Sequence, residues 1–135
     1  MVKKVLVVDD SFIMRTMIRD MIAADSDFEV VGDAADGLKG LEKVKALKPD
    51  VVLLDIEMPN MDGLECLKKI RILSPAKVVI ISSVAQTGSP RAIQARQLGA
   101  FDVIAKPSGA MSLDLRQKKG SAIVQATRLA CGLLL

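Results

Sequence analysis

The sequence predicts an α/β protein built on a doubly wound, five-stranded parallel sheet. Three observations lead to this prediction: short apolar runs, amphipathic segments between them, and a spacing of about 20 to 25 residues from one run to the next. Runs that lack apolar–polar alternation are typical of parallel strands that are covered by helices on both faces.

Five segments are predicted to form the strands. They are apolar and rich in β-branched residues, the second and fifth less purely than the others, and they lie at residues 5–8, 28–31, 51–54, 78–81 and 103–105. Right-handed crossovers between successive strands favour the flavodoxin-like strand order 2-1-3-4-5.

The segments between the strands carry apolar residues at three-to-four spacing, which predicts amphipathic helices at about residues 13–22, 38–47 and 64–70. The fourth helix has the clearest ends. Ser89 is suited to its N-cap, Pro90 to its first position and Gly99 to its termination. A fifth helix is expected at about residues 121–134, after an irregular segment at 108–120.

The chain length of 135 residues predicts a single domain over residues 1–135, with its core at about 3–107. Half of the residues are apolar, whereas Trp, Tyr and His are absent. A chain without histidine lacks the usual general base and the commonest metal ligand. Its chemistry therefore depends on carboxylates, hydroxyls, amines or thiols.

Charge and cysteine content limit the partners and the cellular compartment that are expected for the protein. The net charge of +3 is small and the basic residues are spread over helical segments, so a nucleic-acid partner is not expected. Cys66 and Cys131 lack zinc-type spacing and are predicted to be free thiols. No signal peptide and no apolar run of about 18 residues is present, which favours a cytoplasmic protein without membrane insertion.

Polar side chains follow four of the predicted strands. Asp9 and Asp10 follow the first, Asp55 the third, Ser82 the fourth and Lys106 the fifth. In open parallel sheets the ligand site lies at the carboxyl ends of the strands, so these side chains are expected to meet. Three carboxylates there repel one another by roughly 4 kcal/mol per pair, at about 4 Å and an effective dielectric of about 20. A divalent cation relieves this repulsion, and an oxygen-only site favours Mg²⁺.

These residues suit phosphoryl transfer. Asp55 ends the central run, and as an ionised carboxylate it can attack phosphorus without a general base. Lys106 offers an ammonium group and Ser82 a hydroxyl to the phosphoryl oxygens. Taken singly, each residue has a structural explanation, such as capping of the first helix by Asp10 or Ser11. The prediction depends on the whole set.

Five motifs resemble those of response-regulator receiver domains. They are Val-Asp-Asp-Ser at 8–11, Leu-Asp-Ile-Glu-Met-Pro at 54–59, Asp-Gly at 62–63, Ile-Ser-Ser at 81–83 and Lys-Pro at 106–107. The resemblance implies that a histidine kinase phosphorylates Asp55 and that Ser82 and Lys106 bind the phosphoryl oxygens. It also implies a Mg²⁺ site made of Asp10, Asp55 and the backbone carbonyl of Glu57, with Asp9 helping through a water molecule.

Segments 55–63, 82–88 and 106–114 are similar to the N-terminal regulatory domain of chemotaxis protein-glutamate methylesterases. This similarity implies a receiver that inhibits a following esterase domain until phosphorylation relieves the block. The implied partners are a chemotaxis-type histidine kinase, a methylesterase domain and chemoreceptors. The sequence has no histidine and no nucleophile motif of an esterase, so esterase catalysis is not expected of these residues.

Three alternatives remain at this point. A stand-alone chemotaxis receiver differs from the regulatory domain in the downstream sequence of its gene. A phosphatase of the haloacid dehalogenase kind also uses an Asp nucleophile with Mg²⁺, but it has a second Asp where this chain has Glu57. A nucleotide- or flavin-binding module needs a Gly-rich loop after the first strand, where this chain has Asp9 and Asp10.

Overall fold

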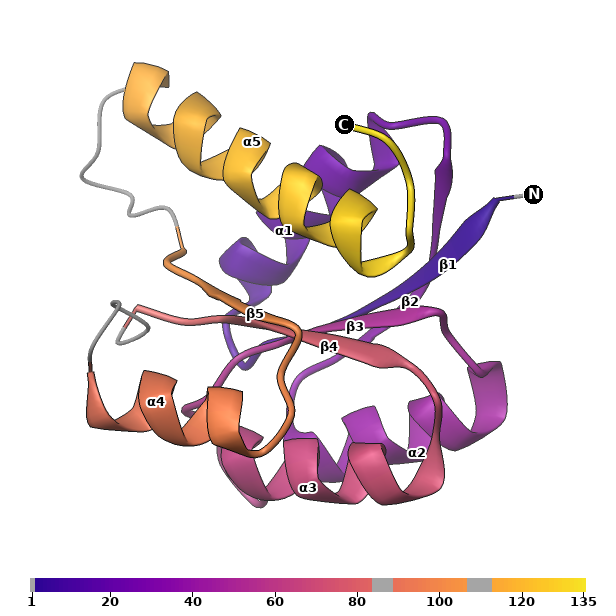
Figure 1. Ribbon diagram of the computed structural model, residues 1–135, viewed down its shortest axis with the longest axis vertical. Helices are drawn as coiled ribbons and strands as arrows, with labels where there is room; N and C mark the ends of the chain where they lie inside the picture. The colour runs from indigo at the N-terminus through magenta and orange to yellow at the C-terminus, as the bar shows by residue number, and fades with distance from the viewer. Residues whose placement is uncertain (1, 84–88, 107–112) are drawn as a thin grey trace.

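The computed structural model describes residues 2–83, 89–106 and 113–135, with the backbone alone described at 113–121 (Figure 1). Within these residues, parallel strands form one sheet in the order β2-β1-β3-β4-β5, as predicted. The strands are β1 (Lys3–Val8), β2 (Phe28–Ala34), β3 (Val51–Leu54), β4 (Lys77–Ile81) and β5 (Asp102–Ile104). The helices are α1 (Phe12–Ala23), α2 (Gly37–Leu47), α3 (Gly63–Leu73), α4 (Pro90–Gln97) and α5 (Leu113–Ala130).

Helices cover both faces of the sheet. The α1 and α5 helices lie against one face, and α2, α3 and α4 lie against the other (Figure 1). Val5 and Val7 of β1 pack in the core beneath α1 and α5. Leu6 and Val8 point the opposite way, into the core beneath α2 and α3. Because successive side chains of a strand face opposite sides, burial of both faces produces the unbroken apolar run seen in the sequence.

Side-chain caps and special backbone conformations set the helix ends. Ser11 caps α1 by accepting a hydrogen bond from the N–H of Met14 at 3.2 Å. Ser89 caps α4 in the same way, Pro90 is its first residue, and Gly99 follows its end with φ of 103°. The predicted ends of this helix are therefore confirmed, and each follows from the conformational preference of the residue.

The second strand is longer than the apolar run that predicted it. It continues past Val31 to Ala34, because its register with β1 shifts between Val5 and Leu6 and pairing resumes between Leu6 and Gly32. The irregularity keeps the less apolar end of β2 in the sheet.

The last helix begins at Leu113, which corrects the expected irregular segment at 108–120 and the expected start at about 121. Residues 107–112 lie outside the described part of the chain. Residues 113–119 are mostly good helix formers, and an interior glycine costs only about 1 kcal/mol relative to alanine, so Gly120 does not end the helix. The helix ends at Ala130 rather than near 134, and Gly132 follows with φ of 74°.

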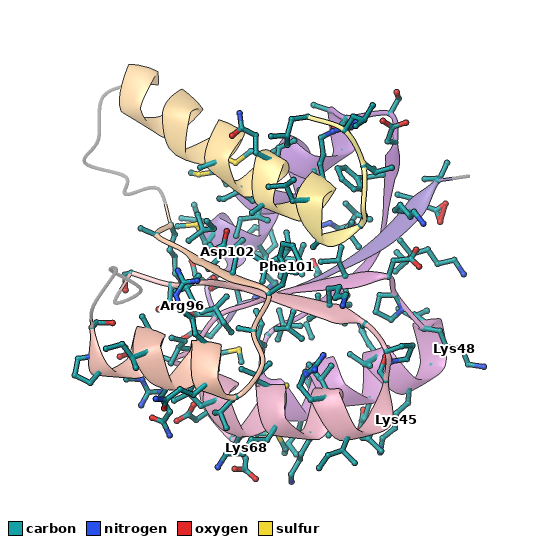
Figure 2. The ribbon with its side chains drawn as sticks, in the orientation of Figure 1. Lys45, Lys48, Lys68, Arg96, Phe101 and Asp102 are labelled. Carbon is teal, nitrogen blue, oxygen red and sulfur yellow. The ribbon has the colours of Figure 1, made fainter. Side chains whose placement is uncertain are left out.

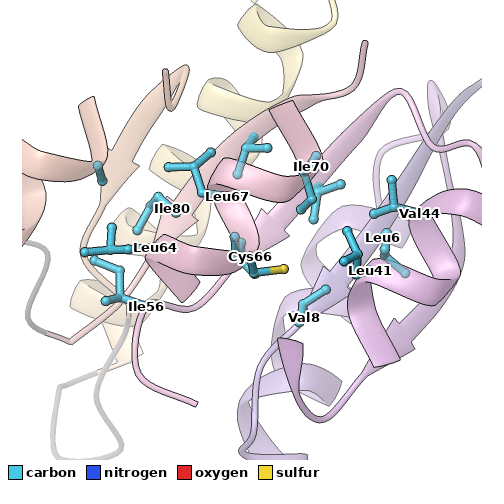
Figure 3. Packing of buried hydrophobic residues seen from close by; sticks show 14 of the residues in the cluster. Leu6, Val8, Leu41, Val44, Ile56, Leu64, Cys66, Leu67, Ile70 and Ile80 are labelled. Carbon is cyan, nitrogen blue, oxygen red and sulfur yellow. The ribbon is translucent and has the colours of Figure 1, made fainter. Parts of the chain in front are cut away.

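Cys66 lies in the core between α3 and the sheet, close to the side chains of α2 (Figure 3). Burial raises the pKa of its thiol to about 11, which makes it unreactive at neutral pH. Both Cys66 and Cys131 are free, as predicted. In the described ranges, no helix is both long enough and apolar enough to span a bilayer.

Candidate functional site

The polar residues predicted from the strand ends meet at the carboxyl edge of the sheet. Asp9 follows β1, Asp55 follows β3, Ser82 follows β4, and Lys106 comes two residues after β5. The first three are at most 4% exposed. The sheet ladder continues into the site, because the N–H of Asp55 donates to the carbonyl of Val8 at 2.9 Å. Backbone pairing therefore fixes where the carboxylates lie.

Lys106 bridges the two buried carboxylates. Its Nζ donates to Asp9 Oδ2 at 2.9 Å and to Asp55 Oδ2 at 3.1 Å, and its side chain is 12% exposed. Burial alone lowers the pKa of Lys106, but the hydrogen bond to Asp9 and the negative charges of Asp55 and Asp9 outweigh burial and raise that pKa above its ordinary value. The ammonium group is therefore charged at neutral pH.

The environment of Asp55 disfavours its ionised form. Burial raises the pKa of Asp55 to about 6, and the charge of Asp9 acts in the same direction. Lys106 opposes the shift, as does the N–H of Glu57, which lies 3.4 Å from Asp55 Oδ1. Further positive charge beside Asp55 would lower its pKa again.

Three carboxylates, one of them that of Asp55, converge at a point where a bound cation would supply positive charge. Asp9, Asp10 and Asp55 each present a carboxylate oxygen, and these oxygens lie within 4.8 Å of one another. Asp10 is exposed, so the cluster opens to solvent on one side. Hard oxygen ligands and an open side suit Mg²⁺, which binds through one or two carboxylates and keeps several waters. The residues present thus fit this ion.

Asp9 is hydrogen-bonded through both of its carboxylate oxygens. Ser11 N–H donates to Oδ1 at 2.8 Å, and Lys106 holds Oδ2. Arg15 Nη1 also donates to the backbone carbonyl of Asp9 at 2.8 Å. A direct metal bond would have to displace one of these partners, whereas contact through a water molecule leaves both in place.

Glu57 and Ser82 complete the set predicted from the sequence. The Glu57 side chain is exposed, in the loop after β3. Ser82 is 1% exposed, and its N–H donates to the carbonyl of Ile104 at 3.2 Å, which joins the ends of β4 and β5. The roles of the Glu57 carbonyl and the Ser82 hydroxyl remain predictions.

Sequence reasoning did not predict the contacts that support the loop after β3. Asp36 is the N-cap of α2 and accepts a hydrogen bond from Asn60 Nδ2 at 3.1 Å. Asp62 is the N-cap of α3, and both of its oxygens accept from Arg91 Nη2 at 3.0 Å. Each Asp lies two residues before the start of a predicted helix, and an Asp just before a helix is a signal for a cap. The partners across the fold carry no such local signal.

The family model for the response regulator receiver domain matches residues 5–117. The chain therefore belongs to the response-regulator receiver family. Within that family it is similar to the receivers of chemotaxis methylesterases. It is 52% identical over 121 residues to the protein-glutamate methylesterase/protein-glutamine glutaminase 1 of Syntrophomonas wolfei, over 90% of this chain and 34% of that protein. The response regulator domain of Thermotoga maritima CheB has a TM-score of 0.87 and 43% identity, with 100% of both chains covered.

Two solved complexes also contain a similar chain. One is the P1 domain of CheA3 with CheY6 from R. sphaeroides, matched with a TM-score of 0.80 and 42% identity over 96% of this chain and 97% of that chain. The other is the CheX-CheY-BeF3-Mg complex from Borrelia burgdorferi, matched with a TM-score of 0.78 and 27% identity over 94% of this chain and 87% of that chain. The chain spans about a third of the length of the curated relatives it matches.

Proposed function

We propose that this receiver domain is switched by phosphorylation of Asp55, with Lys106 and Ser82 binding the phosphoryl oxygens. The observation that carries the proposal is the buried ion pair in which Lys106 Nζ lies 3.1 Å from Asp55 Oδ2. This ammonium group pairs with the carboxylate of Asp55, and after phosphorylation it can pair with the negative charge of the attached phosphoryl group. Family membership supports the same assignment.

The proposed transfer needs no base from the protein. A carboxylate oxygen of Asp55 forms a bond to phosphorus while the phosphorus–nitrogen bond of a phosphohistidine breaks. The bonding pair stays on the imidazole nitrogen, which takes up a proton from solvent water. The product is an acyl phosphate on Asp55, and the added charge lies beside Lys106. Asp9 keeps that ammonium group in place through its 2.9 Å hydrogen bond.

We assign the metal ligands to Asp10, Asp55 and the backbone carbonyl of Glu57, with Asp9 acting through water. The convergence of three carboxylate oxygens within 4.8 Å supports this assignment. So does the solved CheY relative whose complex includes BeF3 and Mg. When bound, Mg²⁺ would neutralise charge on the phosphoryl oxygens during transfer.

We further propose a histidine kinase of the chemotaxis type as the phosphodonor. A chain 42% identical to this one has been solved with the P1 domain of CheA3, which supports that choice. The proposed output is control of a methylesterase domain that acts on chemoreceptors, as the methylesterase relatives suggest. A stand-alone chemotaxis receiver is the alternative, and the gene sequence downstream distinguishes the two. In either role, as a regulatory domain or as a stand-alone receiver, the proposed place of action is the cytoplasm.

Intact-protein mass after incubation with acetyl phosphate tests the proposed chemistry. The native chain should gain one phosphoryl group in the presence of Mg²⁺ and much less after chelation, and Asp55→Ala should gain none. Asp102→Ala is the matched control, because Asp102 begins β5, away from the carboxyl end of the strand, and forms an ion pair with Arg96 rather than with a site residue (Figure 2). No gain by the folded native chain, or an equal gain by Asp55→Ala, would contradict the proposal.

A further inference from the structure

The loop at residues 56–62, here the β3–α3 loop, is fixed at both ends by close backbone packing. A Cβ atom on Gly63 would lie 2.1 Å from the carbonyl oxygen of Asp55, so the start of α3 rests directly on the phosphoacceptor residue. The N–H of Gly63 also donates to the carbonyl of Ile56 at 2.6 Å. The position of the loop is thus tied to the position of Asp55.

The middle of the loop is held by a side-chain contact from another element. Asn60 has φ of 67°, and its Nδ2 donates to Asp36 Oδ2 at 3.1 Å. The second oxygen of Asp36 accepts from the N–H of Lys39 at 2.8 Å and caps α2. One carboxylate therefore joins the start of a helix to the loop that carries Glu57.

Asp36 is a rigid anchor for this contact. It is 7% exposed, and the backbone N–H of Lys39, followed by the amide of Asn60, lowers its pKa below the ordinary value, so it stays ionised. The next residue, Gly37, packs backbone to backbone on the loop, since a Cβ there would lie 2.5 Å from the carbonyl oxygen of Met61. The start of α2 cannot shift without moving the loop.

We propose that Asp36 and Asn60 are positioning residues for metal binding, because their hydrogen bond sets where the β3–α3 loop places the carbonyl of Glu57. The inference depends on the proposed function, in which that carbonyl is a Mg²⁺ ligand. Mg²⁺ requires near-ideal octahedral geometry at about 2.0 to 2.1 Å, so a small displacement of one ligand weakens binding. Neither Asp36 nor Asn60 touches the ion in this arrangement.

Four substitutions distinguish an effect on the position of the β3–α3 loop from an effect on folding stability. Asn60→Gly removes the amide but keeps the left-handed backbone, which glycine adopts freely. Asp36→Ser keeps a good N-cap, but its single hydroxyl oxygen cannot also reach Asn60. Asp36→Asn keeps the cap through its single amide oxygen, and its NH2 group can donate to the amide oxygen of Asn60 once the Asn60 amide is flipped, so Mg²⁺ binding should be retained. Ser89→Ala removes the cap of α4, which measures the effect of lost stability alone.

Mg²⁺ affinity of the unphosphorylated chain is the primary measurement, from amide shifts in an NMR titration. Asn60→Gly and Asp36→Ser are each expected to raise the dissociation constant about fivefold, as expected for loss of one typical hydrogen bond. The double variant should be no weaker than the weaker single variant, because both changes break the same bond. Asp36→Asn and Ser89→Ala should stay within about twofold of the native value.

Phosphorylation by acetyl phosphate gives a second readout. Asn60→Gly and Asp36→Ser should each require more Mg²⁺ for a half-maximal phosphorylation rate and should approach the native rate at saturating Mg²⁺. Native-like Mg²⁺ affinity in folded Asn60→Gly and Asp36→Ser would overturn this inference and leave the proposed function intact. If the native chain itself binds no Mg²⁺, the proposed metal site and this inference both fail.

Discussion

Lys106 reaches across β4 to donate a hydrogen bond to Asp55, although β5 and β3 are not neighbours in the sheet. Its Nζ lies 3.1 Å from Asp55 Oδ2 and 2.9 Å from Asp9 Oδ2. A single long side chain thus connects three strand ends. The site is consequently sensitive to any change in the charge or length of this residue.

Replacement of Lys106 by methionine is expected to raise the pKa of Asp55 well above its present value of about 6. Methionine keeps the length of the side chain but removes the ammonium group, which opposes the effects of burial and of Asp9. Carbon-13 NMR titration of the aspartate carboxyl groups measures the change, which should be about one pKa unit or more. Lys77→Met, at the exposed start of β4, is the control. An unchanged Asp55 titration in Lys106→Met would argue against this account.

Asp55→Asn is expected to increase the free energy of unfolding of the metal-free chain by about 1 to 3 kcal/mol at about pH 7.5. Folding raises the pKa of Asp55 from 3.8 to about 6, so between these values the native state binds a proton that the unfolded state has lost. Native stability therefore falls as pH rises through this window, and the loss is complete above it. Asparagine does not ionise and avoids the loss.

Urea unfolding followed by circular dichroism at several pH values checks this prediction. The difference between Asp55→Asn and the native chain should shrink as the pH falls from about 6 and disappear below about 4. Mg²⁺ should also reduce the difference, because an ion that binds the native state stabilises it. A difference that is constant over this range would mean that Asp55 does not titrate as described.

Gly63→Ala is expected to destabilise the protein by about 2 to 4 kcal/mol. The added Cβ would lie 2.1 Å from the carbonyl oxygen of Asp55 and 2.5 Å from the Cα of Ile56, and neither backbone atom can move freely. Gly132→Ala provides the contrast, because no atom lies within 4 Å and only its φ of 74° resists the change. Its cost should be about 1 kcal/mol. Equal melting temperatures of the two variants would show that the packing at Gly63 relaxes.

Phe12→Ala is expected to slow transfer from a histidine kinase about fivefold to tenfold and to leave phosphorylation by acetyl phosphate unchanged. Phe12 is 72% exposed at the start of α1, two residues after Asp10, and we expect a docked donor to cover it. Arg15 lies over its ring at 5.7 Å and steadies it. Ile72→Ala is the matched control, because Ile72 is 83% exposed near the end of α3, at the opposite edge. Equal slowing by both variants would exclude specific docking at Phe12.

The strands and the main site residues could be predicted because both depend on local patterns. A run buried on both faces identifies a parallel strand, and the residue after each run lies at a known edge of the sheet. This reasoning placed Asp55 and Lys106 together, although it could not give the oxygen that Lys106 contacts.

Other features depend on relationships that no local pattern carries. The Asp36–Asn60 hydrogen bond joins residues 24 positions apart on different elements, so it follows from the assembled fold. The expected boundary of the last helix lies at Gly120, whereas the helix begins at Leu113. A glycine inside a long helix lowers the stability of the helix but does not end it.

The 97 positions that separate Asp9 from Lys106 have a consequence for biosynthesis. A nascent chain that has left the ribosome only as far as β4 already contains Asp9, Asp55 and Ser82, but the ammonium group that holds the carboxylates together is still missing. The charge balance of the site is therefore complete only after the residues that follow β5 have been synthesised.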